Sequence, residues 1–133
     1  MNRRPSPGRP LVLIVDQHAD TRELYGDSLA ALGFKTIAAA DGAQARRRAW
    51  ESHPDIVVTD LALPGVDGWQ LIRDLKREAR TRDIPVVLVT GLAAPWLRQR
   101  AEREGCAACF VKPCLPDELA IQLRQVLDGI VCS

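Results

Sequence analysis

The sequence predicts a doubly wound α/β domain, because short buried strands alternate with amphipathic helices along most of its length. Three apolar, β-branched runs are continuous rather than alternating: Leu11–Val15, Ile56–Val58 and Val86–Val89. Continuous runs of this length are typical of strands buried on both faces of a parallel sheet. Two shorter runs, Lys35–Ala39 and Ala108–Val111, bring the expected number of strands to five.

Five helical patterns follow these strands in turn. The first, Asp20–Leu32, begins with Asp20 as the expected N-cap and Glu23 three residues later, as in a capping box. The others are expected at Gly42–Ser52, Gly68–Arg80, Pro95–Glu104 and Pro116–Ile130. The expected inward residues are Leu24, Tyr25, Ser28, Leu29 and Leu32 in the first helix, Ala45 and Ala49 with some cover from Trp50 in the second, Leu71, Ile72, Leu75 and Ala79 in the third, and Leu119, Leu123, Val126, Leu127 and Ile130 in the fifth.

Regular alternation of strand and helix predicts a parallel sheet with right-handed crossovers and helices on both faces. Five strands favour the flavodoxin-like order 2-1-3-4-5, a three-layer (βα)5 sandwich. The 133 residues fit one domain, which we place at residues 11–131. We expect the basic, proline-rich residues 1–10 to form a disordered tail, and the chain to be a single-domain protein.

Composition and charge disfavour several classes of partner. The chain has 18 basic and 17 acidic residues, a formal net charge of +1 that gives no general attraction to nucleic acid or anionic membrane. No apolar run approaches the roughly 20 residues that span a bilayer. The apolar stretch Leu11–Val15 is also too short for the core of a secretory signal. We therefore expect a cytoplasmic protein without nucleic-acid or membrane partners.

Three of the four cysteines form a cluster with the spacing C-x2-C-x4-C: Cys106, Cys109 and Cys114. A zinc site usually needs four ligands, and the two histidines, His18 and His53, lie far away in sequence. We favour the interpretation that these cysteines are small buried side chains in a reducing compartment. The role of the cluster stays open.

Four chemically compatible residues follow or end four of the predicted strands: Asp16, Asp60, Thr90 and Lys112. In a doubly wound sheet, sites form at the carboxyl ends of the strands, at the point where the strand order reverses. We therefore expect these side chains to meet at one edge. Each residue alone is common in a loop, but together two carboxylates, a hydroxyl and an ammonium can hold Mg²⁺ and neutralise a phosphoryl group.

These segments resemble the bacterial response-regulator receiver family over about residues 11–130. The resemblance is carried by LIVDQHADTRELY, ALGF, ADGAQA, PDIVVTDLALPGVDGWQLI, IPVVLVTG and FVKP. It implies that Asp60 is the phosphoacceptor, and that Asp16, Asp60 and the main-chain carbonyl of Ala62 hold Mg²⁺ or Mn²⁺. The second acidic residue after the first strand is replaced by Gln17, a neutral residue that could still ligate, so we expect weak metal binding.

The resemblance also assigns the switch residues. It implies that Thr90 and Lys112 contact the phosphoryl group, and that the bond from Lys112 to Pro113 is cis. Receivers commonly carry an aromatic residue where this chain has Cys109, a smaller side chain that would alter the coupling between two states.

The favoured hypothesis is a phosphorelay receiver rather than a turnover enzyme. A sensor histidine kinase or histidine phosphotransfer protein would phosphorylate Asp60, and a downstream protein would bind the surface of the fourth helix, fifth strand and fifth helix. The alternative is a pseudo-receiver, weakened by Gln17, that acts as a phosphorylation-independent interaction or dimerisation module. An FMN carrier is disfavoured, because the loop DQHAD lacks a phosphate-cradling Gly, Ser or Thr sequence.

Overall fold

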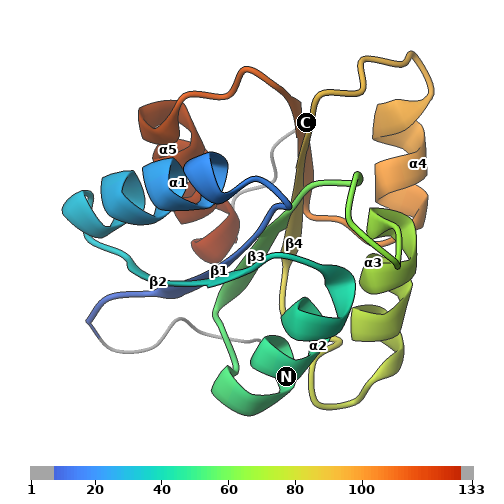
Figure 1. Cartoon of the computed structure of the whole chain (residues 1–133), viewed down its shortest axis with the longest axis horizontal. Coiled ribbons are helices and arrows are strands. Elements are labelled where there is room, and N and C mark those ends of the chain that lie inside the picture. The colour runs from blue at the N-terminus through green and yellow to red at the C-terminus, as the bar shows by residue number, and fades with distance from the viewer. Residues whose placement is uncertain (1–7, 130–133) are drawn as a thin grey trace.

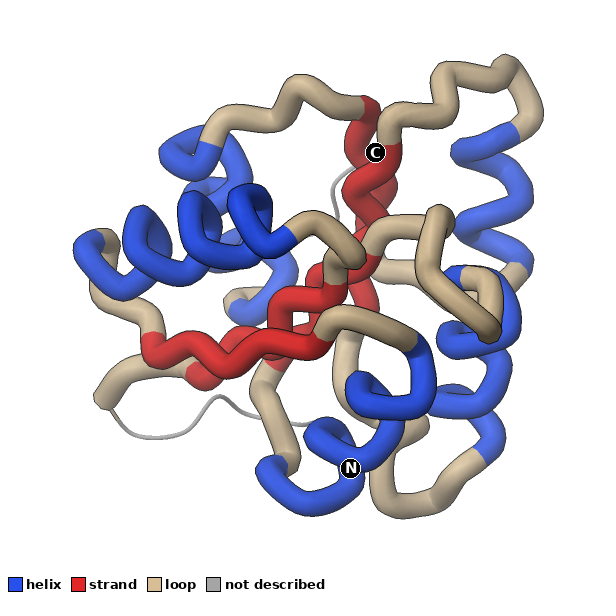
Figure 2. The backbone as a smooth tube through the Cα atoms, viewed as in Figure 1, coloured by secondary structure: helices blue, strands red, loops and turns tan. Residues whose placement is uncertain are grey.

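The computed structural model describes residues 8–129, which form one parallel five-stranded sheet flanked by five helices. The strand order is β2-β1-β3-β4-β5, as the alternation of elements predicts (Figures 1 and 2). All four neighbouring pairs are parallel. The strands are β1 (Leu11–Val15), β2 (Lys35–Ala39), β3 (Ile56–Thr59), β4 (Val86–Thr90) and β5 (Ala108–Val111).

The helices cover both faces of the sheet, which gives three layers. In Figure 1, α1 and α5 lie together on one side, and α2, α3 and α4 lie on the other. The helices are α1 (Ala19–Ala31), α2 (Gly42–Ser52), α3 (Gly68–Arg77), α4 (Leu97–Arg103) and α5 (Pro116–Leu127).

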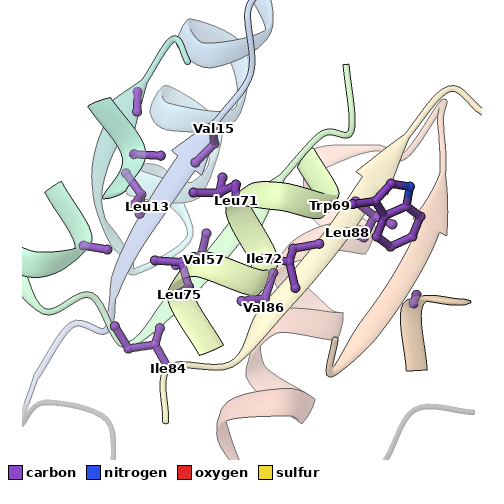
Figure 3. Close-up of a cluster of buried hydrophobic side chains, with 14 of the residues drawn as sticks. Leu13, Val15, Val57, Trp69, Leu71, Ile72, Leu75, Ile84, Val86 and Leu88 are labelled. Atoms are coloured by element: carbon purple, nitrogen blue, oxygen red, sulfur yellow. The ribbon is translucent and has the colours of Figure 1, made fainter. Parts of the chain in front are cut away.

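The apolar core is divided by the sheet into two clusters, because successive strand residues point to opposite faces. Leu13, Val57 and Leu88 belong to the cluster under α2, α3 and α4, shown in Figure 3. Val12 and Val58 belong to the cluster under α1 and α5. Both faces of the central strands are therefore buried, and a fully buried Leu or Val side chain contributes about 1.5–3 kcal/mol. This burial fixes the register that positions the strand ends.

Helix α1 begins one residue earlier than the sequence predicts. Its N-cap is His18, so the prediction that Asp20 caps it is wrong. Tyr25 and Leu29 are buried against the sheet, whereas Leu24 is 56% exposed and Leu32 is 40% exposed. The buried stripe is narrower than expected because Leu32 lies beyond the last helical residue and Leu24 is rotated away from the buried pair.

Helix α3 ends three residues earlier than expected. Glu78 leaves the helical conformation, with φ −82° and ψ 127°. The Thr81 hydroxyl donates to the Leu75 carbonyl at 2.7 Å, which satisfies an acceptor of the last turn. Ala79 is consequently exposed rather than inward.

Two tryptophans are partly exposed at the surface, and Trp50 gives less cover to its helix than the sequence indicates. Helix α4 starts at Leu97, so Trp96 lies in the preceding turn and is 46% exposed. Trp50 is also 46% exposed, so the buried apolar face of α2 is formed mainly by Ala45 and Ala49, as their positions predict. The expected inward position of Ile130 lies outside the described residues, as do residues 1–7 of the expected tail.

Trp69, by contrast, is only 8% exposed. It lies on α3 in the cluster of Figure 3, and the Arg100 guanidinium of α4 stacks over its ring at 4.5 Å. The two helices are also joined by an ion pair between Arg73 and Glu104, 2.8 Å apart. These contacts fix α4 against α3 next to the carboxyl edge of the sheet.

Candidate functional site

The carboxyl ends of four strands bring the predicted residues to one edge. The Asp16 amide donates to the Ala39 carbonyl, and the Asp60 amide donates to the Val15 carbonyl. Backbone pairing therefore continues one residue past β1 and β3 and fixes both carboxylates side by side, because these strands are neighbours. The Lys112 amide likewise donates to the carbonyl of Thr90, at the ends of β5 and β4.

The Lys112 ammonium joins the two carboxylates. Its Nζ lies 2.8 Å from Oδ2 of Asp16 and 2.8 Å from Oδ2 of Asp60. The two carboxylate side chains are only 5% and 8% exposed, and the lysine side chain is 26% exposed. One positive charge therefore neutralises part of two nearly buried negative charges that would otherwise repel each other.

The remaining carboxylate oxygens accept hydrogen bonds from their own loops. Oδ1 of Asp60 accepts from the amides of Leu61 at 2.6 Å and Ala62 at 3.3 Å. Oδ1 of Asp16 accepts from the His18 amide at 2.9 Å and lies 3.0 Å from the ring Nδ1 of His18. The side chain of His18 is 64% exposed, and nothing in the sequence predicts this contact of its ring with Asp16.

The pKa values at the site follow from these contacts. Burial raises the pKa of Asp16, but hydrogen bonds from Lys112 and His18 outweigh burial, so this pKa lies below its ordinary value. Burial lowers the pKa of Lys112, but the hydrogen bonds to Asp16 and Asp60 outweigh it, so this pKa lies above its ordinary value. Lys112 is therefore protonated at neutral pH.

Thr90 is at the expected place but is oriented toward its own loop. Its side chain is nearly buried, and its hydroxyl accepts a hydrogen bond from the Leu92 amide at 3.2 Å. Tyr25 is a neighbour of the site that the sequence pattern does not predict. Together with the two carboxylates and Lys112, Tyr25 lines a small cavity of about 10 Å³ beneath them, and its hydroxyl donates to the Cys114 carbonyl at 2.7 Å.

The oxygen donors at this edge fit a hard divalent cation in kind. Mg²⁺ is commonly held by one or two carboxylates and several waters, and here Asp16, Asp60 and the Ala62 carbonyl offer two carboxylates and one carbonyl. Each of these oxygens already accepts a hydrogen bond. The Ala62 carbonyl accepts one from the Gln17 side-chain amide at 3.2 Å. A cation would therefore share these oxygens with donors of the protein and compete with them.

The cysteines do not gather into one site. Cys106 and Cys109 pack in the cluster under α2, α3 and α4, whereas Cys114 packs in the cluster on the opposite face of the sheet. Within residues 8–129, no group of three or more His, Cys, Asp or Glu side chains is placed to hold a metal. Of the three cysteines expected to be buried, Cys109 is buried, whereas Cys106 and Cys114 are half-buried. Burial of its thiol still raises the pKa of Cys106 to about 12.

Cys109 and Cys114 also line a cleft of about 430 Å³ between α4 and the loop that leads into α5. The rim of this cleft includes Val111 and Pro113. The peptide bond from Lys112 to Pro113 is cis, as the resemblance implies. The smaller side chain at Cys109 thus lies at the wall of a cleft next to the site.

Comparison with known proteins decides the family. The family described as "Response regulator receiver domain" matches residues 12–124. This chain belongs to that family. The receiver domain is 37% identical over 119 residues to the phosphate regulon transcriptional regulatory protein PhoB of Klebsiella pneumoniae, covering 90% of this chain and 52% of PhoB. It is 35% identical over 102 residues to the polar-differentiation response regulator DivK of Brucella ovis, covering 77% of this chain and 83% of DivK.

Solved structures support the same assignment. The chemotaxis response regulator CheY4 of Vibrio cholerae has 25% identity and a TM-score of 0.83, covering 90% of this chain and 99% of CheY4. A signal receiver domain of a histidine kinase from Syntrophus aciditrophicus has 30% identity and a TM-score of 0.81, covering 93% of this chain and 94% of that one. The receiver domain spans about half the length of the PhoB proteins that it matches. In residues 8–129, none of the helices has the length and apolar character needed to cross a membrane.

Proposed function

We propose that this receiver domain accepts a phosphoryl group on Asp60 from a sensor histidine kinase or a histidine phosphotransfer protein. The observation that carries the proposal is the contact of the Lys112 ammonium with both carboxylates at the carboxyl edge. Burying a pair of carboxylates with one lysine costs desolvation free energy. Clusters of this kind are therefore concentrated at functional sites. Membership of a family of signalling modules supports phosphoryl transfer as the function of this site.

In the proposed reaction, a carboxylate oxygen of Asp60 attacks the phosphorus atom of the donor. A phosphorus–oxygen bond forms, the bond from phosphorus to the donor imidazole breaks, and the product is an acyl phosphate. The amides of Leu61 and Ala62, which now donate to Oδ1, orient the carboxylate. Lys112 contributes a positive charge that can follow the negative charge onto the phosphoryl oxygens.

A divalent cation, Mg²⁺ or Mn²⁺, would be held by Asp16, Asp60 and the Ala62 carbonyl. When bound, it would neutralise charge on the transferring phosphoryl group. Asp16 carries the negative charge that attracts the cation. His18, which donates through its amide to Oδ1 of Asp16, keeps that carboxylate oriented toward the site.

The proposed output is a change in partner binding at the surface of α4, β5 and α5. A phosphoryl group adds about −1.5 to −2 charges at neutral pH, which would draw the Thr90 hydroxyl away from the Leu92 amide and toward the phosphoryl oxygens. Trp96, Val111 and Leu115 are each at least 44% exposed next to the cleft beside Cys109 and give this surface apolar anchors for a downstream protein. In this role the domain works in the cytoplasm and is not a turnover enzyme.

The experiment is intact-mass analysis after incubation with acetyl phosphate, with and without Mg²⁺. The wild type should gain one phosphoryl group in a Mg²⁺-dependent manner, and Asp60→Asn should gain none. Asp67→Asn is the matched control, since Asp67 caps α3 through the Gln70 amide and asparagine caps equally well. A folded wild type that gains no phosphoryl group at any Mg²⁺ concentration would instead favour the pseudo-receiver.

A further inference from the structure

The hydrogen bond from Gln17 to Ala62 ties two loops together across the candidate cation site. Gln17 lies in the loop after β1, and Ala62 lies in the loop after β3, 45 residues later. The donor is the side-chain amide nitrogen of Gln17, and the acceptor is the main-chain oxygen of Ala62, 3.2 Å away. A carboxylate at position 17 has no proton to donate and could not make this bond.

The Ala62 peptide group is therefore held from two sides. Its N–H donates to Oδ1 of Asp60 at 3.3 Å, and its carbonyl accepts from Gln17. If the Gln17 side-chain amide were turned the other way, its oxygen would face the Ala62 carbonyl oxygen without a proton between them. In this arrangement the N–H₂ end of the Gln17 amide, rather than its oxygen, faces the carbonyl that would ligate the cation.

We propose that Gln17 is a gate on the cation site rather than a ligand in it. This inference rests on the proposed function, since it assumes that a divalent cation uses the Ala62 carbonyl. The Gln17 amide uses one of the two lone pairs of that carbonyl and turns its positive N–H₂ end toward it, so a cation must compete with this hydrogen bond. The same amide takes the place of the cation in joining the two loops when no cation is bound.

The gate and the ligand hypotheses predict opposite signs for the same substitutions. If Gln17 were a ligand, Gln17→Ala and Gln17→Met would both weaken Mg²⁺ binding. If it is a gate, both variants free the carbonyl and tighten binding by about two- to fivefold, the range expected for one exposed neutral hydrogen bond. Gln17→Met keeps the length of the side chain, so it separates loss of the hydrogen bond from loss of bulk.

A third variant adds charge to the same position. Gln17→Asp removes the donor and also supplies a carboxylate, so Mg²⁺ should bind more tightly than to Gln17→Met, by a further tenfold or so. The expected order of affinity is therefore wild type, then Gln17→Met and Gln17→Ala, then Gln17→Asp as the tightest. Because Gln17 is exposed, all three variants should keep the fold.

The test is a Mg²⁺ titration followed by the backbone amide NMR shifts of Leu61 and Ala62 and by the rise in melting temperature. Asp60→Asn, which removes a carboxylate of the site, should abolish the response and so assigns it to this site. Tighter binding to both Gln17→Met and Gln17→Ala supports the gate. Weaker or unchanged binding to these two variants overturns it, and so does a lack of Mg²⁺ binding by every variant.

This titration needs no phosphoryl donor, so its outcome is separate from the proposed function. If the affinities follow the expected order but Asp60 accepts no phosphoryl group, the gate stands and the phosphorelay proposal fails. If Asp60 is phosphorylated but the Gln17 variants bind Mg²⁺ no more tightly, the phosphorelay proposal stands and the gate fails.

Discussion

Replacing Lys112 with methionine should destabilise the domain at neutral pH, because it leaves two carboxylates close together without their shared cation. The methionine side chain keeps most of the apolar stem, so the change is mainly one of charge. The two carboxylates are 5% and 8% exposed and each lies 2.8 Å from the lysine nitrogen. Removing one partner of a fully buried ion pair costs about 3–5 kcal/mol. Since the Lys112 side chain is 26% exposed, we expect a loss of about 2 kcal/mol in unfolding free energy.

The loss should depend on pH in a defined direction. Lys112 has a raised pKa, so its contribution is complete below its ordinary value of 10.5 and declines only as the pH rises through the higher folded value. Asp16 has a lowered pKa, so its contribution is present above its ordinary value of 3.8 and declines as the pH falls through the lower folded value. In Lys112→Met the carboxylates can relieve their repulsion by taking up a proton. The difference from wild type should therefore be largest near pH 7 and shrink toward pH 4.

The assay is chemical unfolding of wild type and Lys112→Met at pH 7 and pH 4. Lys35→Met is the matched control, since Lys35 is an exposed lysine at the start of β2 and its loss should change stability little. Adding Asp60→Asn to Lys112→Met should restore part of the lost stability at pH 7. A loss at pH 7 within about 0.5 kcal/mol, the range of ordinary surface substitutions, would refute the reasoning. So would an equal loss at both pH values.

Three further predictions concern the elements around the site. Gly68→Ala places a Cβ 2.5 Å from the Leu61 Cα and 2.6 Å from the Asp60 carbonyl oxygen, so the unfolding free energy should fall by about 1–3 kcal/mol. The control Gly91→Ala meets nothing within 4 Å and should change the unfolding free energy little. Equal effects of the two substitutions in denaturant titrations would contradict this prediction. Asp67→Ala removes the cap of α3 and should cost about 1 kcal/mol in the same titrations; an unchanged midpoint would argue against the cap. Burial raises the pKa of Cys106 to about 12, so peptide mapping should find slow alkylation by iodoacetamide at pH 8 in the native protein and fast alkylation in guanidinium; equal rates would contradict the burial.

The order of the strands and the place of the charged residues could be predicted because both follow from local pattern. Continuous apolar runs identify buried parallel strands, and in such a sheet the residue after each strand has a fixed place at the carboxyl edge. Asp16 and Asp60 therefore had to lie side by side once β1 and β3 were neighbours. The ammonium of Lys112 arrives at the same edge from β5, two strands away from Asp60, because a lysine side chain is long enough to reach across β4.

Contacts between distant loops could not be predicted in the same way. The Gln17 amide was considered as a weak metal ligand, and nothing in the sequence indicates that it donates to Ala62 instead. The ring of His18 turns back onto Asp16 for reasons of loop geometry. These bonds depend on side-chain rotamers and loop conformations that no periodic pattern encodes.

Helix ends also depended on tertiary contacts. The apolar spacing of α3 continues to Ala79, but the Thr81 hydroxyl binds the Leu75 carbonyl and the chain leaves the helix after Arg77. At α4, Pro95 suggests a first helical turn, yet the helix begins two residues later at Leu97. Local propensity predicts where a helix lies. Its first and last residues depend on the groups that form hydrogen bonds with the unpaired backbone N–H and C=O groups at its ends.

The central claim is that Asp60 carries the phosphoryl group, and reductive trapping tests it most directly. The protein is incubated with acetyl phosphate and Mg²⁺ and then treated with borohydride, which reduces an acyl phosphate to an alcohol. Peptide mapping should then find homoserine at position 60 only, and only in samples that received acetyl phosphate. Homoserine at another carboxylate, or unmodified aspartate at position 60 in a protein whose intact mass shows a phosphoryl group, would contradict the assignment.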